Sequence, residues 1–185
     1  MGGDGEKRFA WRIHGTRAIY DNPWIKLDLV DVEQPDGHRF EHHVVRLRAA
    51  AIAAMIDDQD RVLMLWRHRF VADRWGYELP GGLVDDGDEP IETIAREMRE
   101  ETGFRAARIE HLLSFEPMVG MVDSPHHLFI ARGLERFGEP TEVNESARQQ
   151  WLPLASIPDL IARGEIWNSG TLITLMHVLL SRPRR

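Results

Sequence analysis

The sequence predicts an α+β fold built in layers, and two observations carry that prediction. Many apolar residues alternate with polar ones, as along "WIKLDLVDVE" at 24–33, and a period of two is typical of strands. Only a few segments repeat apolar residues at the helical period, which favours sheets covered by few helices over a doubly wound fold. We expect a single domain at 9–182, preceded by a disordered segment at 1–8.

The bulk composition limits the possible functions. A chain of 185 residues with 43% hydrophobic content can bury one sizeable core. Its formal net charge of -7 gives no general attraction to nucleic acid or to an anionic membrane, so neither is an expected partner. The chain has no cysteine, which excludes disulfides, thiolate zinc sites and cysteine nucleophiles. Since no apolar leader or bilayer-length apolar run is present, the sequence predicts a cytoplasmic protein.

Four strands are expected before the first helix. The alternation at 24–33 resumes at 38–47, and "QPDG" between these segments predicts a turn, so they form a hairpin. The stretch 49–70 contains two apolar segments joined at "DDQD" and predicts two further strands. The pattern then changes to that of a helix.

The first helix is expected at 90–101, "PIETIAREMREE". Asp88 or a neighbour caps its start, and Gly103 ends it in the left-handed conformation. Its apolar residues recur at i, i+3, i+4 and i+7, so they form one buried stripe on the helix. The stripe consists of Ile91, Ile94, Ala95 and Met98.

Three strands and two helices are expected after the first helix. The segments 108–117 and 126–134 have the composition of strands, and 151–154 is a short one. Helices at 155–164 and 169–182 close the fold. The last helix places Leu172, Leu175, Met176 and Leu179 on one face.

Three carboxylates crowd the end of the first helix. Glu97, Glu100 and Glu101 are spaced i, i+3 and i+4, so they share a face where the helix dipole is negative. Two such charges about 5–6 Å apart repel by roughly 3 kcal/mol at an effective dielectric of about 20. A divalent cation reverses that sign, and oxygen ligands suit Mg²⁺ or Mn²⁺. The alternative is an ordinary charged surface in which Arg96 and Arg99 neutralise the glutamates.

The loop "PGG" at 80–82 and the carboxylate turn together resemble the Nudix hydrolase family. The box of that family places a glycine, an acid and then Arg-Glu-x-x-Glu-Glu-x-Gly at fixed spacing, and the chain matches it from Gly82 to Phe104. Asp88 stands where the family has Glu. The resemblance implies an α/β/α sandwich with a mixed β-sheet and an N-terminal antiparallel strand pair. It also implies hydrolysis of a nucleoside diphosphate joined to another group.

The resemblance also implies roles for single residues. The carbonyl of Gly81 and the carboxylates of Glu97, Glu100 and Glu101 are implied to hold Mg²⁺, or Mn²⁺ in its place. A glutamate in the loop after the box is implied to be the general base: the spacing favours Glu145, while Glu142 and Glu97 remain alternatives. Arg96 is implied to brace the glutamates. The predicted catalytic residues are therefore Glu97, Glu100, Arg96 and Glu145.

Segments outside the box resemble the ADP-ribose pyrophosphatase branch of the family. They include "WGYELPGGLVDDGDEP" and "NESARQQWLPL". That branch implies a homodimer in which the N-terminal strands contribute to the partner's adenosine pocket, and it usually has Gln at the position of Arg67. The plainer alternatives are a core position for Trp24 and a solvated strand end for Arg69. We predict Trp24, Arg67, Arg69, Gly82 and Asp123 as substrate-binding residues, and interpret Trp75, Trp151 and Trp167 as core or interface residues.

The sequence thus predicts a Mg²⁺-dependent Nudix pyrophosphohydrolase. Its expected substrate is ADP-ribose or a similar nucleoside diphosphate sugar, cleaved to a nucleoside monophosphate and a sugar phosphate. Two alternatives stay open: a Nudix module that binds such a ligand without hydrolysing it, and a Nudix hydrolase for another nucleoside diphosphate derivative. The complete Arg-Glu-x-x-Glu-Glu sequence argues against the sensor.

Overall fold

The computed structural model describes residues 7–142 and 146–182, which form two compact units. The first unit comprises the chain up to Arg48 together with Met118–Ser124, and the second comprises the rest. The predicted disordered segment at 1–8 falls mostly on residues 1–6, which lie outside the described residues. The single domain at 9–182 stays a prediction.

The first unit is a four-stranded sheet in the order β1-β2-β3-β9. The predicted hairpin is confirmed as the antiparallel pair of β2 (Lys26–Glu33) and β3 (Arg39–Arg46), with Leu29 opposite His43. The strand β1 (Arg12–Asp21) was not predicted: all of its residues are exposed, and a strand without a buried face shows no apolar alternation. The short strand β9 (Val122–Asp123) runs parallel to β3.

The second unit contains a mixed sheet, as expected. Its order is β7-β4-β10-β8, in which β10 (His126–Arg136) runs parallel to β4 (Ala50–Met55). The strands β8 (Phe104–Phe115) and β7 (Gly81–Leu83) are antiparallel to their neighbours. A separate antiparallel sheet has the order β11-β5-β6, formed by β11 (Arg148–Pro153), β5 (Arg61–Arg69) and β6 (Arg74–Glu78).

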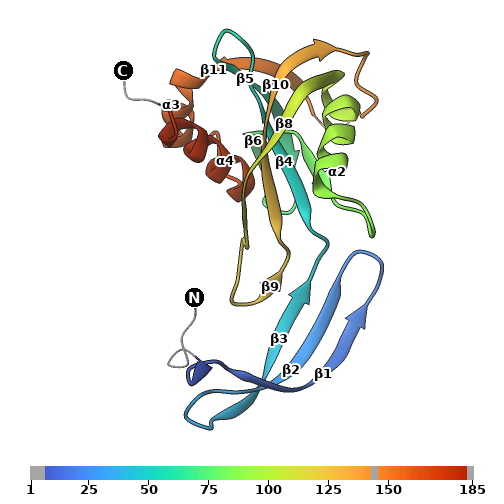
Figure 1. The fold of residues 1–185 in the computed structure, drawn as a ribbon, viewed down its shortest axis with the longest axis vertical. Helices are drawn as coiled ribbons and strands as arrows, with labels where there is room; N and C mark the ends of the chain where they lie inside the picture. The colour runs from blue at the N-terminus through green and yellow to red at the C-terminus, as the bar shows by residue number, and fades with distance from the viewer. Residues whose placement is uncertain (1–6, 143–145, 183–185) are drawn as a thin grey trace. The chain divides into compact units, whose positions relative to one another are not determined.

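Helices cover both faces of the mixed sheet, so the predicted α/β/α sandwich is confirmed (Figure 1). On one face, Ala51, Ala53 and Met55 of β4 pack in a core cluster with two residues of the first helical segment. These are Ile94 of helix α2 (Pro90–Glu97) and Met98, the C-cap of that helix. On the other face, alternate β4 residues pack against α3 (Ile157–Ala162) and α4 (Ser169–Leu180). The alternation of β4 between two cores explains why its sequence is apolar throughout.

Two details of the helices differ from the prediction. The N-cap of α2 is Glu89, a neighbour of Asp88, and its side chain makes no capping hydrogen bond. Ile91, expected in the buried stripe, is 44% exposed, and Met176 of α4 is 50% exposed. Because α4 is apolar on most sides, its pattern does not determine which face is buried. That face is formed by Gly170, Thr171, Thr174, Leu175 and Val178.

Candidate active site

The helix that carries the three predicted carboxylates does not end as a regular α-helix. After Glu97 the chain continues as a five-residue π-helical turn, Met98–Thr102. Gly103 then ends the helix with a φ of 75°, the left-handed conformation predicted for it. Single π-helical turns inside helices are frequent at functional sites.

Three carboxylates meet beside this turn. One oxygen from each of Glu97, Glu101 and Glu142 lies within 4.8 Å of the other two. Glu97 and Glu101 are buried, with exposed fractions of 8% and 3%. Glu100, predicted as part of the cluster, instead accepts a hydrogen bond from Arg96 at 3.0 Å. Arg96 also lies 2.9 Å from Glu97 Oε1, so it has the bracing position that the resemblance implied.

Backbone hydrogen bonds hold Glu142 at the helix end. The amides of Thr141 and Glu142 donate to the carbonyl of Glu100 at 2.8 and 3.1 Å. The amides of Phe137 and Gly138 donate to the carbonyl of Gly103 at 2.8 and 3.1 Å. The loop is thereby attached to the turn that bears Glu101. Glu145, the general base favoured by the sequence, lies outside the described residues.

The glycine-rich loop closes the cluster from β7. The amide of Gly81 donates to Glu101 Oε2 at 2.9 Å. A Cβ on Gly82 would lie 2.4 Å from the carboxyl carbon of Glu97, so no other residue fits there without moving that side chain. The carbonyl of Gly81 as a metal ligand stays a prediction.

Glu101 is embedded in protein donors. Arg67 on β5 donates from Nη2 to Glu101 Oε1, and Gln149 on β11 donates to the backbone carbonyl of Glu101 at 2.8 Å. Burial raises the pKa of Glu101 to about 7, although the ion pair with Arg67 and the Gly81 hydrogen bond oppose that rise. At Arg96 burial lowers the pKa of the guanidinium, but the nearby carboxylates of Glu97 and Glu100 outweigh it and raise that pKa.

The donor set fits a hard divalent cation. The cluster offers only carboxylate oxygens, which are the ligands of Mg²⁺ and Mn²⁺, whereas zinc sites favour histidine and cysteine. Three acidic side chains within 4.8 Å of one another, two of them buried, also need positive charge nearby. Arg67 and Arg96 supply part of that charge.

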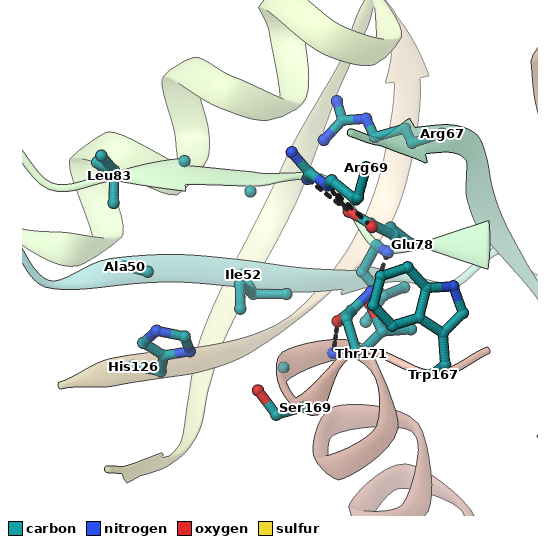
Figure 2. Close-up of a pocket in the computed structure, with 15 residues that line it drawn as sticks. Ala50, Ile52, Arg67, Arg69, Glu78, Leu83, His126, Trp167, Ser169 and Thr171 are labelled. Carbon is teal, nitrogen blue, oxygen red and sulfur yellow. Dashed lines mark hydrogen bonds and ion pairs between the residues drawn. The ribbon is translucent and has the colours of Figure 1, made fainter. Parts of the chain in front are cut away.

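A cavity of about 600 Å³ adjoins the cluster in the second unit (Figure 2). Arg67 and the loop glycines Gly81 and Gly82, which contact Glu101 and Glu97, form part of its wall. Arg69 also lines it and donates from Nε to Glu78 Oε1 at 3.0 Å. The wall also contains Ala50, Ile52, Leu79, Leu83, His126, Trp167, Asn168, Ser169, Gly170 and Thr171.

Trp167 has a different environment from the one predicted. We expected a core or interface position, but the indole forms part of the cavity wall, as Figure 2 shows. Its Nε1–H donates to the carbonyl of Trp75 at 3.1 Å, and the guanidinium of Arg74 lies 5.2 Å from its ring. His126, in the same wall, has a pKa lowered by burial. Neither residue carries a sequence signal for this role, because the strands and loops that bring them here are distant in sequence.

Two predicted substrate residues, Trp24 and Asp123, belong to the first unit. Trp24 is 68% exposed, which contradicts the alternative of a core position, and the Arg48 guanidinium lies 5.2 Å from its ring. Asp123 on β9 accepts a hydrogen bond from Arg46 at 2.6 Å. Their role toward a substrate stays a prediction.

An α/β/α sandwich with this carboxylate turn and glycine loop defines a hydrolase that acts on diphosphate-type bonds. The chain belongs to the Nudix family: residues 46–173 match the model of the NUDIX domain, and residues 11–45 match that of the nucleoside diphosphate sugar hydrolase N-terminal domain. The resemblance inferred from the box is therefore confirmed, as is the prediction of a Nudix hydrolase.

Relatives of established activity match over most of the chain. A CMP-5'-(N-acetyl-N-hydroxy-3-aminopropyl)phosphonate hydrolase of Streptomyces rubellomurinus is 47% identical over 169 residues, covering 91% of this chain and 82% of the relative. An ADP-ribose pyrophosphatase of Mycobacterium tuberculosis is 33% identical over 150 residues, covering 80% of this chain and 72% of the relative. A crystal structure of an ADP compounds hydrolase superposes with a TM-score of 0.79 at 19% identity, covering 92% of both chains, which shows the shared fold.

Proposed function

We propose that this protein hydrolyses the phosphoanhydride bond between a nucleoside monophosphate and a second phosphoryl or phosphonyl group. The observation that carries the proposal is the meeting of Glu97, Glu101 and Glu142 beside a cavity that is large enough for a nucleotide. ADP-ribose is the first member of this substrate class. Because a relative at 47% identity hydrolyses a CMP-linked phosphonate, a cytidine nucleotide joined to a phosphonate is the second.

The metal site follows from the same residues. We propose that Glu97, Glu101 and Glu142 hold Mg²⁺, or Mn²⁺, with Gly81 and Glu100 as further ligands. A bound divalent cation neutralises charge on the diphosphate and lowers the pKa of an attacking water. Arg96 fixes the carboxylates of Glu97 and Glu100 through its contacts at 2.9 and 3.0 Å. These contacts restrict the side chains before a substrate arrives.

The general base is proposed to be Glu142, with Glu145 and Glu97 as the alternatives. Glu142 comes from a loop outside the helix, and backbone hydrogen bonds to Glu100 hold that loop. In the reaction, a water oxygen forms a bond to phosphorus and the bridging P–O bond breaks. The carboxylate accepts one water proton, and the departing oxygen leaves as part of the second phosphate or phosphonate.

Substrate contacts are proposed at the cavity. Arg69 lies at the end of β5 with its side chain 50% exposed, so it can pair with a phosphate oxygen as well as with Glu78. Gly82, which lines the cavity and makes room for the carboxyl group of Glu97, is proposed as a further binding residue. Trp24 and Asp123 of the first unit, together with Arg67, complete the predicted set of binding residues.

A second copy of the chain is proposed as a partner. The strand β1 is exposed along its whole length and carries Ile13 and Ile19, which are 69% and 45% exposed. β1 is also the edge strand of its sheet, and an exposed edge strand can pair with another chain, so we propose a homodimer through this unit. We propose that the enzyme acts in the cytoplasm, because a chain without cysteine fits a reducing compartment. No helix among the described residues is both long and apolar enough to cross a membrane.

The test is a substrate panel measured with the purified full chain. ADP-ribose, a nucleoside diphosphate hexose and a CMP-linked alkylphosphonate are incubated with Mg²⁺, and released nucleoside monophosphate is quantified by chromatography. Release that stops on chelation, and that the Glu97→Gln variant lacks, is the expected result. Tight binding of one compound with no monophosphate released over a long incubation would instead support a sensor.

A further inference from the structure

Arg67 provides a positive charge inside the carboxylate cluster. Only 3% of its surface is exposed, and its Nη2 donates to Oε1 of Glu101, whose side chain is also buried. The other oxygen, Oε2, accepts the amide hydrogen of Gly81 at 2.9 Å. Both carboxylate oxygens of Glu101 are therefore engaged by donors of the protein itself.

The protein itself neutralises part of the negative charge of the cluster. Arg67 pairs with Glu101, and Arg96 lies within ion-pair distance of both Glu97 and Glu100. A buried carboxylate is stable only when it is paired, so Arg67 relieves the repulsion that the sequence predicted for this turn. A divalent cation that enters the cluster meets this guanidinium at short range and is repelled by it.

We propose that Arg67 is a resident counter-cation of the acidic cluster, which holds Glu101 and the Gly81 loop in place and weakens the cluster's affinity for a divalent cation. This inference rests on the proposed metal site and adds a positioning residue that tunes it. A site whose negative charge is already partly neutralised binds a metal most strongly together with an anionic diphosphate. The substrate's own phosphates then complete the site.

A matched control lies two residues further along the same strand. Arg69 lines the same cavity and pairs with Glu78, whose side chain is 6% exposed. Removing the charge of Arg69 tests the effect of losing one positive charge in the cavity wall. Removing the charge of Arg67 tests the contact with Glu101. Arg67→Lys keeps the positive charge at this position but replaces the planar guanidinium by an ammonium group.

The experiment measures binding of Mn²⁺ alone to the full chain by electron paramagnetic resonance. Arg67→Gln is expected to bind Mn²⁺ at least about tenfold more tightly than the wild type, because a nearby positive charge has been removed. Arg67→Lys is expected to bind like the wild type, and Arg69→Gln within about twofold of it. In chelator, the melting temperature of Arg67→Gln should fall, and Mn²⁺ should raise it by more than it raises that of the wild type.

Equal Mn²⁺ affinities of the wild type and Arg67→Gln would overturn the inference and leave the metal site standing. If none of the proteins binds Mn²⁺, the proposed metal site fails as well. If Arg67→Gln is not recovered folded, the comparison is made between Glu101→Gln and the double variant Arg67→Gln/Glu101→Gln, which lack the buried carboxylate. The double variant should again bind Mn²⁺ more tightly, and equal affinities overturn the inference.

Discussion

Two arginine–carboxylate pairs, one in each unit, show how differently the same chemistry is used in this molecule. Arg39 on β3 donates to Asp31 on β2 at 2.7 Å, but both side chains are partly exposed, at 54% and 33%. Arg67 and Glu101 form a pair whose side chains are 3% and 2% exposed. Water competes for the first pair and salt screens it, whereas neither weakens the second to the same degree.

The surroundings of the two pairs differ in the same way. The Arg39–Asp31 pair joins neighbouring strands that are already hydrogen-bonded to each other. The Arg67–Glu101 pair joins β5 to the π-helical turn, and Glu101 in turn accepts the amide hydrogen of Gly81 on β7. The exposed pair is thus one contact among many, while the buried pair connects separate elements at the proposed metal site.

The largest effect is expected at the cluster itself. Glu97→Gln should lower kcat by about 10³-fold or more, because it removes a buried charged ligand from the site where phosphate charge develops. Glu92→Gln, on the exposed first turn of the same helix, should retain wild-type rates. Steady-state release of nucleoside monophosphate measures both. Similar rates in the two variants would mean that hydrolysis does not depend on the cluster.

Stability distinguishes the two ion pairs directly. In chelator, Arg67→Gln should lower the free energy of unfolding by about 3–5 kcal/mol, because it leaves a buried carboxylate unpaired. Arg39→Gln should give no measurable change, since both partners can be hydrated. Urea denaturation followed by circular dichroism gives both values. A large loss in Arg39→Gln, or none in Arg67→Gln, would remove the contrast between the units.

Two variants in the loop after the helix distinguish the candidates for the general base. Glu142→Gln should lower kcat by about 10²-fold or more, the usual contribution of general-base catalysis, with a smaller change in KM. Glu145→Gln should change kcat by less than tenfold if Glu142 fulfils this role. The pH dependence of kcat in both variants provides the check. The reverse order of effects would restore the assignment that the sequence spacing favoured.

A single methyl group tests the close approach at the glycine loop. Gly82→Ala places a carbon 2.4 Å from the carboxyl carbon of Glu97, so that side chain must move, and kcat should fall by up to about 10²-fold. Gly15→Ala on β1 meets no atom within 4 Å and should be silent. Kinetics and thermal melting of the two variants measure the difference. Unchanged activity in Gly82→Ala would show that Glu97 does not need its present position.

The sequence predicted the strands that alternating or continuous apolar segments mark. The hairpin of β2 and β3 and the strands β4 and β5 show their alternation or apolar runs, and each is present. It missed β1, because none of its residues is buried, and it placed the exposed Met176 on the face of α4 that packs, because that helix is apolar on most sides. In both elements the sequence shows no contrast between an apolar face and a polar face.

The site was predictable where its residues are close in sequence. Glu97, Glu101 and Gly82 belong to one motif, and the structure brings them together. Glu100 accepts a hydrogen bond from Arg96, and its role as a ligand stays a prediction. The π-helical turn after Glu97 is not apparent from the spacing of the motif. The contact of Arg67 with Glu101 and the place of Trp167 in the cavity depend on strand order. A local pattern contains no information on strand order.

The central claim is that the carboxylates of Glu97, Glu101 and Glu142 hold the divalent cation on which hydrolysis depends. Anomalous X-ray scattering from crystals that contain Mn²⁺ and a diphosphate ligand tests it most directly. The account predicts a manganese peak among these three carboxylates, and its loss in the Glu97→Gln variant. Manganese bound elsewhere, with the three side chains paired only to Arg67 and Arg96, would contradict the account.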